Sequence, residues 1–336
     1  MRIRVLGAAA GGGFPQWNCN CENCRRAWRG EVPAQTQASL AVTADNAHWF
    51  LLNTSPDLRA QILATPDLHP KQIGRHSPIV GVILTNGDVD AVAGLLSLRE
   101  SQRLAVYATN RVLSVLDANG IFQVLNPDLV ARRGLELDRP IELRNRDGAP
   151  MGLRVTGFSV PGKPALYLEG TDIDAHLAER SENTIGLEIE ETATGKRLFY
   201  IPGCAAIDAP LMARLRGAAL LFFDGTLWRD DEMIRAGAGA KTGRRMGHMS
   251  VSGPYGTMAA LAGSGIARKI FIHINNTNPL HRHDSAERAE AEAAGWEIAQ
   301  DGMKLALPRD SARELARLGG SSPDIKLPRR RRPRPA

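Results

Sequence analysis

The chain has 336 residues, of which 43% are hydrophobic, and its formal net charge is +6. It contains no uninterrupted apolar run of about 18 residues, which excludes a conventional transmembrane helix. Its N-terminus also lacks the apolar segment of a secretory signal peptide, so we expect a cytoplasmic protein with no membrane span.

The positive charge is concentrated near the C-terminus. Lys326 and five arginines, at 329–332 and 334, account for six of the 42 basic residues, which leaves 36 to balance the 36 acidic ones. Because a Pro/Arg-rich segment cannot bury a core, we predict one folded domain over residues 1–307 and a disordered tail over 308–336. Such a tail is usually a solvated extension, and we expect no nucleic-acid partner.

A glycine-rich loop follows the first predicted strand. Residues 1–7 alternate in polarity, as in a strand, and the loop runs from Gly7 to Gly13. A glycine-rich turn after a first strand is typical of dinucleotide sites. Here Phe14 and Pro15 follow the loop in place of a helix, so the dinucleotide motif is not matched.

Three of the four cysteines, Cys19, Cys21 and Cys24, lie within six residues. In a protein expected to be cytoplasmic this spacing favours a metal clip over a disulfide, although reduced surface thiols are the alternative. A tetrahedral structural zinc needs a fourth ligand, and His273 and Asn276 are the candidates.

The rest of the chain alternates between apolar runs and amphipathic segments. The runs predict strands at residues 37–43, 49–53, 78–84, 104–108, 153–160, 185–190, 197–201, 220–223 and 269–273. The amphipathic segments predict helices at 111–119, 208–215, 256–262 and 286–294, and a further helix capped by Ser55. Strands and then a helix occur twice over, which predicts an α+β fold of two packed mixed sheets with helices outside.

Two acidic residues, Asp88 and Asp90, follow the predicted strand 78–84 and an Asn86-Gly87 turn. Carboxylates two residues apart at a strand end can reach one hard cation. The alternative is that Asp88 caps the next helix and that Asp90 interacts favourably with its dipole.

Three later residues of metal-binding type also stand at strand ends or turns. Asp224 and His273 close apolar strands, and His248 lies in a Gly-containing turn. Singly, each has another explanation: a turn hydrogen bond, a helix-cap neighbour, or a buried structural histidine. Taken with Asp88 and Asp90, they indicate a single site built from carboxylates and imidazoles.

Basic residues precede His248 in a glycine-rich segment. Lys241, Arg244 and Arg245 suit a ligand that carries carboxylates or phosphates, although a solvated loop is the alternative. His281 and His283 alternate in a polar loop, and we expect both at the surface.

Several segments together resemble the family of pyrroloquinoline quinone (PQQ) biosynthesis B proteins over residues 1–307. They are GGGFPQWNCNCENC (11–24), TQASLAV (36–42), NTSPDLRAQI (53–62), LTNGDVDAVAGLLSLRE (84–100), FSVPGK (158–163), YIPGC (200–204), FFDGTLWRDDEMIRAG (222–237), TGRRMGH (242–248) and HINNTNP (273–279). The resemblance implies a metallo-β-lactamase-like αββα sandwich of two mixed β-sheets flanked by helices.

The resemblance also implies two metal sites. Cys19, Cys21 and Cys24 match the family's structural zinc motif. The positions that correspond to active-site metal ligands are Asp88, Asp90, Asp224, His248 and His273. The family usually has Asp-His where this chain has Asp90-Ala91, and Ala91 cannot bind a metal, so one ligand is missing.

The resemblance implies a role in maturing the quinone from a Glu–Tyr unit excised from a peptide. Our first hypothesis is Fe(II)- and O₂-dependent hydroxylation of the tyrosine ring, with Asp90, His248 and Asp224 as catalytic residues. The second is a carrier that moves PQQ or its precursor toward the periplasm without turnover, which Ala91 favours. The third is a metal-dependent hydrolase such as a phosphodiesterase, against which the lack of a His-x-His-x-Asp-His motif argues. The expected partners are the small-molecule or dipeptide precursor and other PQQ-biosynthesis proteins.

Overall fold

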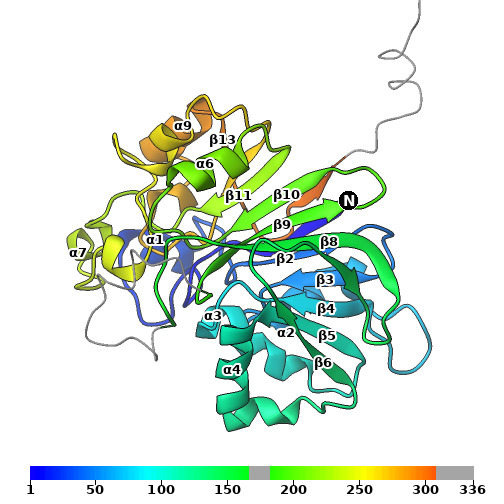
Figure 1. Cartoon of the computed structure of the whole chain (residues 1–336). Coiled ribbons are helices and arrows are strands. Elements are labelled where there is room, and N and C mark those ends of the chain that lie inside the picture. The colour runs from blue at the N-terminus through cyan, green and yellow to red at the C-terminus, as the bar shows by residue number, and fades with distance from the viewer. Residues whose placement is uncertain (166–181, 308–336) are drawn as a thin grey trace, which may run out of the picture.

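A computed structural model describes residues 1–165 and 182–307 (Figure 1). Within these residues two seven-stranded sheets pack face to face, and helices lie on their outer sides. The predicted αββα sandwich is therefore confirmed. The predicted tail, residues 308–336, lies outside the described residues.

Each sheet combines antiparallel and parallel pairs. The first sheet contains, in spatial order, β14 (Lys304–Ala306), β1 (Arg2–Gly7), β2 (Ser39–Thr43), β3 (Trp49–Leu52), β4 (Ile79–Ile83), β5 (Leu104–Thr109) and β6 (Val130–Leu135). The second contains β13 (Trp296–Ile298), β12 (Lys269–Ile272), β11 (Leu220–Asp224), β10 (Arg197–Ile201), β9 (Ile185–Glu191), β8 (Pro150–Ser159) and β7 (Ile141–Arg144).

The parallel pairs place the carboxyl ends of neighbouring strands together. β3 to β6 are parallel in the first sheet, and β10 to β13 are parallel in the second. In such sheets the loops that follow the carboxyl ends form the usual ligand-binding edge. The loops after β4, β11 and β12 are the ones that bear the acidic and histidine residues singled out above.

Helices and single turns complete the outer layers. The helices are α1 (Glu22–Trp28), α2 (Leu58–Ala64), α3 (Val89–Val92), α4 (Asn110–Ala118), α6 (Ala209–Leu215), α7 (Glu232–Arg235), α8 (Thr257–Ala260) and α9 (Ala286–Ala293). The 3₁₀ turns are η1 (Pro66–Leu68), η2 (Ala93–Leu98), η3 (Gly120–Val124), η5 (Arg244–Met246) and η6 (Pro279–His281). None of the helices within residues 1–165 and 182–307 combines the length and apolar character needed to cross a bilayer.

The core lies between the two sheets and beneath the outer helices. Phe50 and Tyr107 from the first sheet and Tyr200 and Phe222 from the second belong to one buried cluster between the sheets. Because the strands are covered on both faces, β1 is buried along most of its length in spite of its alternating sequence. Its Arg4 is buried as well and forms an ion pair of 2.7 Å with Asp67 in η1.

The helix expected to be capped by Ser55 begins later than predicted. α2 starts after Asp57, and neither residue caps it through its side chain. The Asp57 carboxylate instead accepts hydrogen bonds from the backbone and side chain of Gln37. The Ser55 hydroxyl donates to Gln61. A tertiary partner therefore uses the Asp57 carboxylate, whereas the Ser55 hydroxyl bonds within its own segment, also accepting from the backbone N–H of Asp57.

Candidate functional site

A cavity of about 600 Å³ opens where the carboxyl ends of the strands meet. Its walls come from the loop after β1, the loop after β4, and the segments after β10, β11 and β12. Of the predicted site residues, Asp88, Asp90, Lys241, His248 and His273 line it. Asp224 is fully buried directly behind His248. The structure thus brings together residues from distant segments, such as Asp90 and His273, which are 183 positions apart in the chain.

Asp224, at the end of β11, holds His248. Its Oδ2 lies 2.7 Å from Nδ1 of His248 and accepts a hydrogen bond of 2.8 Å from the backbone N–H of Cys204. One potential ligand atom from each of Asp224, His248 and His273 lies within 4.8 Å of the other two. The three side chains are therefore close enough to act on a single ion or on a single substrate atom.

The Thr226 hydroxyl group contacts all three of these side chains. Its Oγ1 lies 3.1 Å from Nδ1 of His248 and 2.8 Å from Nδ1 of His273, and it donates to Oδ1 of Asp224 at 2.6 Å. The two imidazole rings stack with their centroids 5.2 Å apart. The histidines are thus fixed as a parallel pair.

Asp90 contacts the other edge of His273. Its Oδ2 lies 3.0 Å from Nε2 of His273, and both side chains are mostly buried. Gly11 allows this arrangement, because a Cβ there would lie only 3.3 Å from Asp90 Oδ2. Asp88 stands at the N-cap position of α3, but its side chain makes no capping hydrogen bond there and it lines the cavity.

The electrostatics of the cavity couple the acids to the histidines. Burial alone would raise the pKa of Asp90, but the hydrogen bond and charge of His273 outweigh it and lower that pKa. Burial likewise opposes protonation of His273, yet Asp90, with Asp224 and Asp88, raises the pKa of His273 above its ordinary value. The pKa of Asp224 is lowered, because the charge of His248 outweighs the effect of burial. The site therefore favours ionised carboxylates at Asp90 and Asp224.

Two lysines line the same cavity. Lys241 was expected from the sequence, while Lys163, in the loop after β8, was not. The stem of Lys163 packs on Gly247, where a Cβ would lie 3.1 Å from Lys163 Cγ. Arg244 and Arg245 are exposed on η5 and are not among the residues that line the cavity. Their role in substrate binding stays a prediction.

Ala91 stands where the resemblance implied a histidine ligand. It is buried, it lines the cavity beside Asp90, and its carbonyl accepts hydrogen bonds from the backbone and hydroxyl of Thr54. Its methyl group offers no atom that could bind a metal. The potential metal ligands on the α3 side of the cavity are therefore the carboxylates of Asp88 and Asp90.

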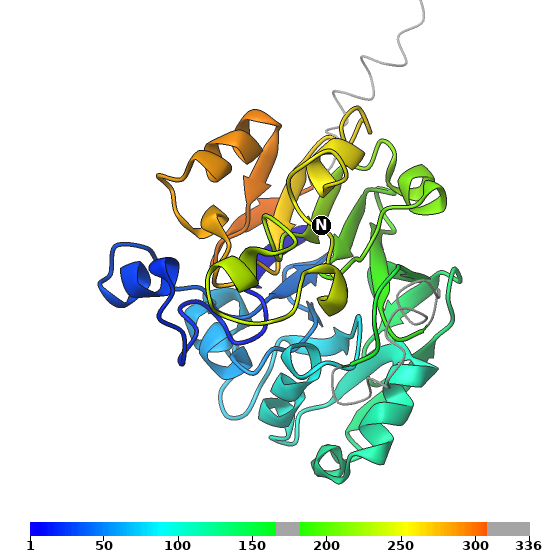
Figure 2. The same ribbon diagram turned by 90° about the vertical axis from the view of Figure 1, so that its left-hand side faces the viewer.

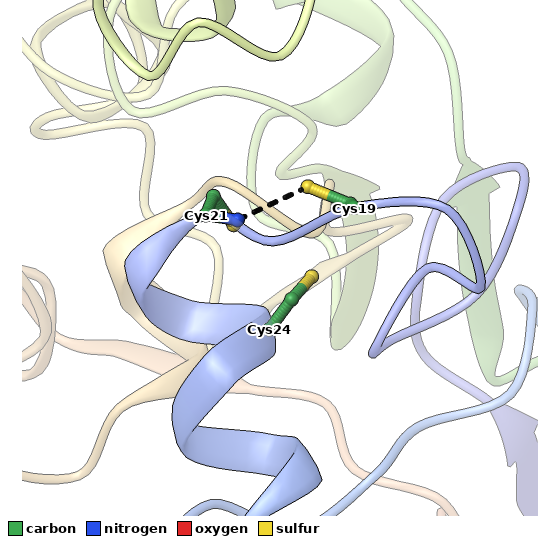
Figure 3. A group of neighbouring side chains, drawn as sticks. All are labelled: Cys19, Cys21 and Cys24. Atoms are coloured by element: carbon green, nitrogen blue, oxygen red, sulfur yellow. Dashed lines mark hydrogen bonds between the residues drawn. The ribbon is translucent and has the colours of Figure 1, made fainter.

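The three clustered cysteines form a second group of potential metal ligands. Figure 3 shows Cys19, Cys21 and Cys24 pointing toward one another from the start of α1 and the loop before it, with the backbone N–H of Cys21 3.5 Å from Cys19 Sγ. The three Sγ atoms lie within 4.8 Å of one another. Burial raises the pKa of the Cys21 thiol to about 12, and the neighbouring thiols contribute to the same shift.

Asn276 covers the cysteine group. Its Nδ2 lies 3.1 Å from Cys19 Sγ, 3.4 Å from Cys24 Sγ and 3.8 Å from Cys21 Sγ. The ring of His273, the other fourth-ligand candidate, hydrogen-bonds inside the cavity instead. Oxygen and nitrogen of an amide can exchange places by rotation, so the Asn276 side chain can present its oxygen to a cation at this position.

The cysteine group and the cavity lie at the same end of the sandwich. Figures 1 and 2 both show α1 and α7 at this end, with the yellow-green segment around α7 in front of the sheets in Figure 2. Residues 16, 18–21 and 236–238 line one surface cavity there. The turn after β12 supplies both His273 to the large cavity and Asn276 to the cysteines.

The prediction that His281 lies at the surface is wrong, whereas His283 is exposed as expected. The His281 ring stacks on Phe14 at a centroid distance of 3.9 Å, and its Nε2 lies 3.2 Å from the carbonyl oxygen of Ile274. Burial lowers the pKa of His281 to about 4. His281 is therefore a neutral imidazole that packs as an aromatic ring, which explains why it is buried.

Sequence reasoning also missed Thr226 and Lys163. Both stand in quoted segments, FFDGTLW and FSVPGK, and both line the cavity. The signal was present for Thr226, because it lies two residues after Asp224 at the same strand end.

Comparison with known proteins agrees with this architecture. The family model described as "Beta-lactamase superfamily domain" matches residues 48–274. A diphosphatase of the PhnP family is 19% identical with a TM-score of 0.62, covering 92% of this chain and 98% of that one, and so shares the fold. The family model and the fold define a protein of the metallo-β-lactamase superfamily.

Relatives of higher sequence identity show to which family within this superfamily the chain belongs. Coenzyme PQQ synthesis protein B of Rhodopseudomonas palustris (strain TIE-1) is 55% identical over 308 residues, which are 91% of this chain and 100% of the relative. The protein of that name from Gluconacetobacter diazotrophicus is 56% identical over 303 residues, covering 90% and 98%. The crystal structure of Zn²⁺-bound PqqB from Methylobacterium extorquens has a TM-score of 0.86 at 50% identity and covers 91% and 100%. The chain belongs to the coenzyme PQQ synthesis protein B family.

Proposed function

We propose that this chain acts in PQQ biosynthesis by hydroxylating the tyrosine ring of a Glu–Tyr precursor, using Fe(II) and O₂. The observation that carries the proposal is the meeting of Asp90, His248 and His273 at one cavity of about 600 Å³. A volume in this range is typical of sites for small-molecule ligands. Membership of the family supports a role in PQQ biosynthesis. The imidazole and carboxylate donors of the cavity support Fe(II)-dependent hydroxylation.

The residues present fit a non-haem iron. The donors around the cavity are imidazole nitrogens and carboxylate oxygens, a combination that suits Fe(II) and leaves positions open for other ligands. Asp224, His248 and His273, whose potential ligand atoms lie within 4.8 Å of one another, would hold the ion, with Asp90 beside His273. Bound there, Fe(II) would supply the activation of O₂.

The other cavity residues bind and orient the precursor. Lys241 and Lys163 supply cationic groups for its carboxylates. Ala10, Ala38, Val89 and Met246 give the cavity apolar surface against which an aromatic ring can pack.

The overall reaction balances with an external reductant. One oxygen atom of O₂ enters the ring C–H bond as a hydroxyl group, and the other leaves as water. The reductant supplies two electrons, and the solvent supplies two protons. The chain itself is unchanged at the end of the cycle.

The cysteine group fits a different ion. Three thiols of Cys19, Cys21 and Cys24 beneath one amide, that of Asn276, suit a closed tetrahedral zinc site. We assign this zinc a structural role, because it would fix the loop before α1 against the turn after β12. A Zn²⁺-bound PqqB that is 50% identical supports the choice of zinc as the ion.

The test is turnover by iron-loaded protein. The protein is mixed with the Glu–Tyr precursor, ¹⁸O₂ and a reductant, and the product is analysed by mass spectrometry for one ¹⁸O atom in the ring. The Ala91→His variant restores the missing ligand and is assayed beside the unaltered chain, with Asp90→Asn and anaerobic samples as controls. Absence of labelled product from both the unaltered chain and Ala91→His overturns the hydroxylase proposal.

A carrier role is the second candidate, and Ala91 favours it. With one ligand position replaced by a methyl group, the cavity keeps its volume and its lysines but has a poorer donor set for a metal. Such a cavity would bind PQQ or its precursor without turnover. Tight quinone binding by metal-stripped protein supports this role, and binding that requires metal counts against it.

A further inference from the structure

The end of the sandwich opposite the cavity carries exposed aliphatic side chains. Ile73, in the loop between η1 and β4, is fully exposed, and Leu63, near the end of α2, is 59% exposed. The loop returns to α2, because Nε2 of His69 lies 3.0 Å from the carbonyl oxygen of Leu63. Scattered apolar side chains are common on protein surfaces, so these two count only together with the charges around them.

Cations lie beside these aliphatic side chains. Arg2, Lys71 and Lys304 are exposed, and none of them forms an ion pair with any residue that the structure describes. Arg2 and Arg4 are two residues apart in β1, and Lys304 pairs with Arg4, so the three side chains share one face of the sheet. The pKa of Asp67 is lowered by its hydrogen bond to Arg4 and further by the charges of Lys304 and Lys71. The loop and the strands therefore form one surface, the far-end patch, which consists of Arg2, Leu63, Lys71, Ile73 and Lys304.

The segment that follows β14 brings a larger positive charge to this patch. Residues 308–336 contain nine basic and three acidic residues, which gives a net charge of +6, and four of the basic residues are the consecutive arginines 329–332. The rest of the chain holds 33 basic and 33 acidic residues and is neutral. Because the segment starts three residues after Lys304, its charge is tethered beside the far-end patch.

Basic residues next to exposed aliphatic side chains fit the surface of an anionic lipid bilayer. Each lysine or arginine near such a surface adds favourable electrostatic energy, and apolar side chains gain free energy by entering the head-group layer. Either contribution alone gives weak attachment, whereas the two together are typical of proteins that bind at the membrane surface. A nucleic acid would attract the same cations, but its phosphates give the aliphatic side chains no apolar layer to enter. The combination therefore favours a lipid surface.

Attachment through the far-end patch leaves the cavity accessible. β1 begins at Arg2, in the patch, and ends at Gly7, where the loop that supplies Gly11 and Gly12 to the cavity wall begins. Figure 1 shows the N end of the chain on the right of the sandwich and the helices α3 and α7 on its left. The cavity therefore opens away from a surface that the patch contacts.

We propose that the far-end patch, together with the arginine-rich segment 308–336, binds the surface of an anionic lipid bilayer without crossing it. The segment supplies most of the electrostatic attraction, and Leu63 and Ile73 enter the head-group layer. Small molecules reach the cavity from the water while the protein is attached. The inference requires neither the hydroxylase nor the carrier role, so its tests are independent of the proposed function.

The first test measures co-sedimentation of the full chain with lipid vesicles. We expect binding to vesicles that mix phosphatidylglycerol with phosphatidylcholine, no binding to phosphatidylcholine alone, and weaker binding as the salt concentration rises. Changing the arginines at 329–332 to glutamine should weaken binding at least about 100-fold. The matched control changes four exposed arginines at the cavity end and should bind nearly as the unaltered chain does: Arg25→Gln, Arg29→Gln, Arg229→Gln and Arg235→Gln. Absence of binding to the anionic vesicles, or equal weakening by the two sets of changes, overturns the proposal.

The second test examines the aliphatic contact and the choice of lipid over nucleic acid. Ile73→Ser should bind the anionic vesicles about tenfold more weakly, because one exposed side chain no longer leaves water. Ile234→Ser, at an exposed isoleucine of α7 on the cavity side, should bind them as the unaltered chain does. Equal affinities of these two variants overturn the role of the patch. Tighter binding of the unaltered chain to a DNA duplex than to the vesicles overturns the lipid assignment.

Discussion

Glu232 provides a sharp test of how the turn after β12 is held. It lies in α7 and is almost fully buried. One of its carboxylate oxygens accepts a hydrogen bond of 2.6 Å from the Thr277 hydroxyl, and the other accepts one of 2.7 Å from the backbone N–H of Trp228. Burial raises the pKa of Glu232 from 4.5 to about 7 in spite of these hydrogen bonds, and the charge of Glu287 adds to the increase.

The consequence is a loss of stability as the pH rises. A group whose pKa is raised in the folded state contributes fully to stability below its unfolded pKa, here 4.5, and that contribution is lost as the pH passes through about 7. The difference between these two pKa values corresponds to about 3 kcal/mol in the free energy of unfolding. About 2–3 kcal/mol of it falls between pH 5 and pH 8.

Glu232→Gln removes the titration while approximating the shape of the protonated acid. Free energies of unfolding are measured by urea denaturation at several values between pH 5 and pH 8, with both metal sites held in one state. We expect the variant to gain roughly 2–3 kcal/mol over the unaltered chain as the pH rises from 5 to 8. Taking the difference between the two proteins cancels every other titrating group, including His281.

Glu290→Gln, which changes an exposed glutamate on α9, is the matched control and should give a difference that does not vary with pH. If Glu232→Gln also gives a constant difference from pH 5 to pH 8, then Glu232 is already ionised in the fold at pH 5. The reasoning from burial would then be refuted.

Three further changes test the two candidate metal sites and the cavity. Cys24→Ser should reduce the zinc content by about one ion per chain in elemental analysis, whereas Cys204→Ser, at a buried thiol that donates to a carbonyl, should not. Ala91→His should tighten Co²⁺ binding at the cavity by about tenfold or more, equivalent to at least about 1.4 kcal/mol, in a calorimetric titration of zinc-saturated protein. Lys241→Met should weaken binding of a dicarboxylate precursor by roughly tenfold or more, because a charge-assisted hydrogen bond is lost, whereas Arg245→Met should change it little. A Lys241→Met protein that binds the precursor like the unaltered chain would exclude that lysine from the binding site.

The fold was predictable because the apolar runs are strong and their spacing is regular. The run 220–223 and the run 269–273 were expected as strands and form β11 and β12. These two strands are parallel neighbours, so the residues that follow them, Asp224 and His273, come together without any further assumption. The placement of polar residues at strand ends was therefore visible in the sequence.

What the sequence did not reveal depends on contacts between distant segments. Ser55 and Asp57 form a good local capping signal, but Gln37 from another segment takes up the Asp57 carboxylate in the folded protein. His281 lies in a polar loop, yet the ring of Phe14 covers it. Periodicity and capping rules see only neighbours in the chain, so they cannot detect such partners.

The turn from His273 to Asn278 is where these separate features depend on one another. His273 has a positive φ of 59°, which turns the chain so that its ring faces the cavity, and three residues later Asn276 faces the cysteines. Thr277 is held by Glu232, while Asn278 donates to the carbonyl of Gly225. The ladder of β12 with β11 ends at Ile272, and beyond it only Ile274 pairs with Ala9 while the backbone N–H of Asn275 donates to the carbonyl of Thr226. The rest of the turn is held by side-chain contacts with α7, the cysteine group and the end of β11, and an ion held by the cysteines would therefore help to position the histidine of the cavity.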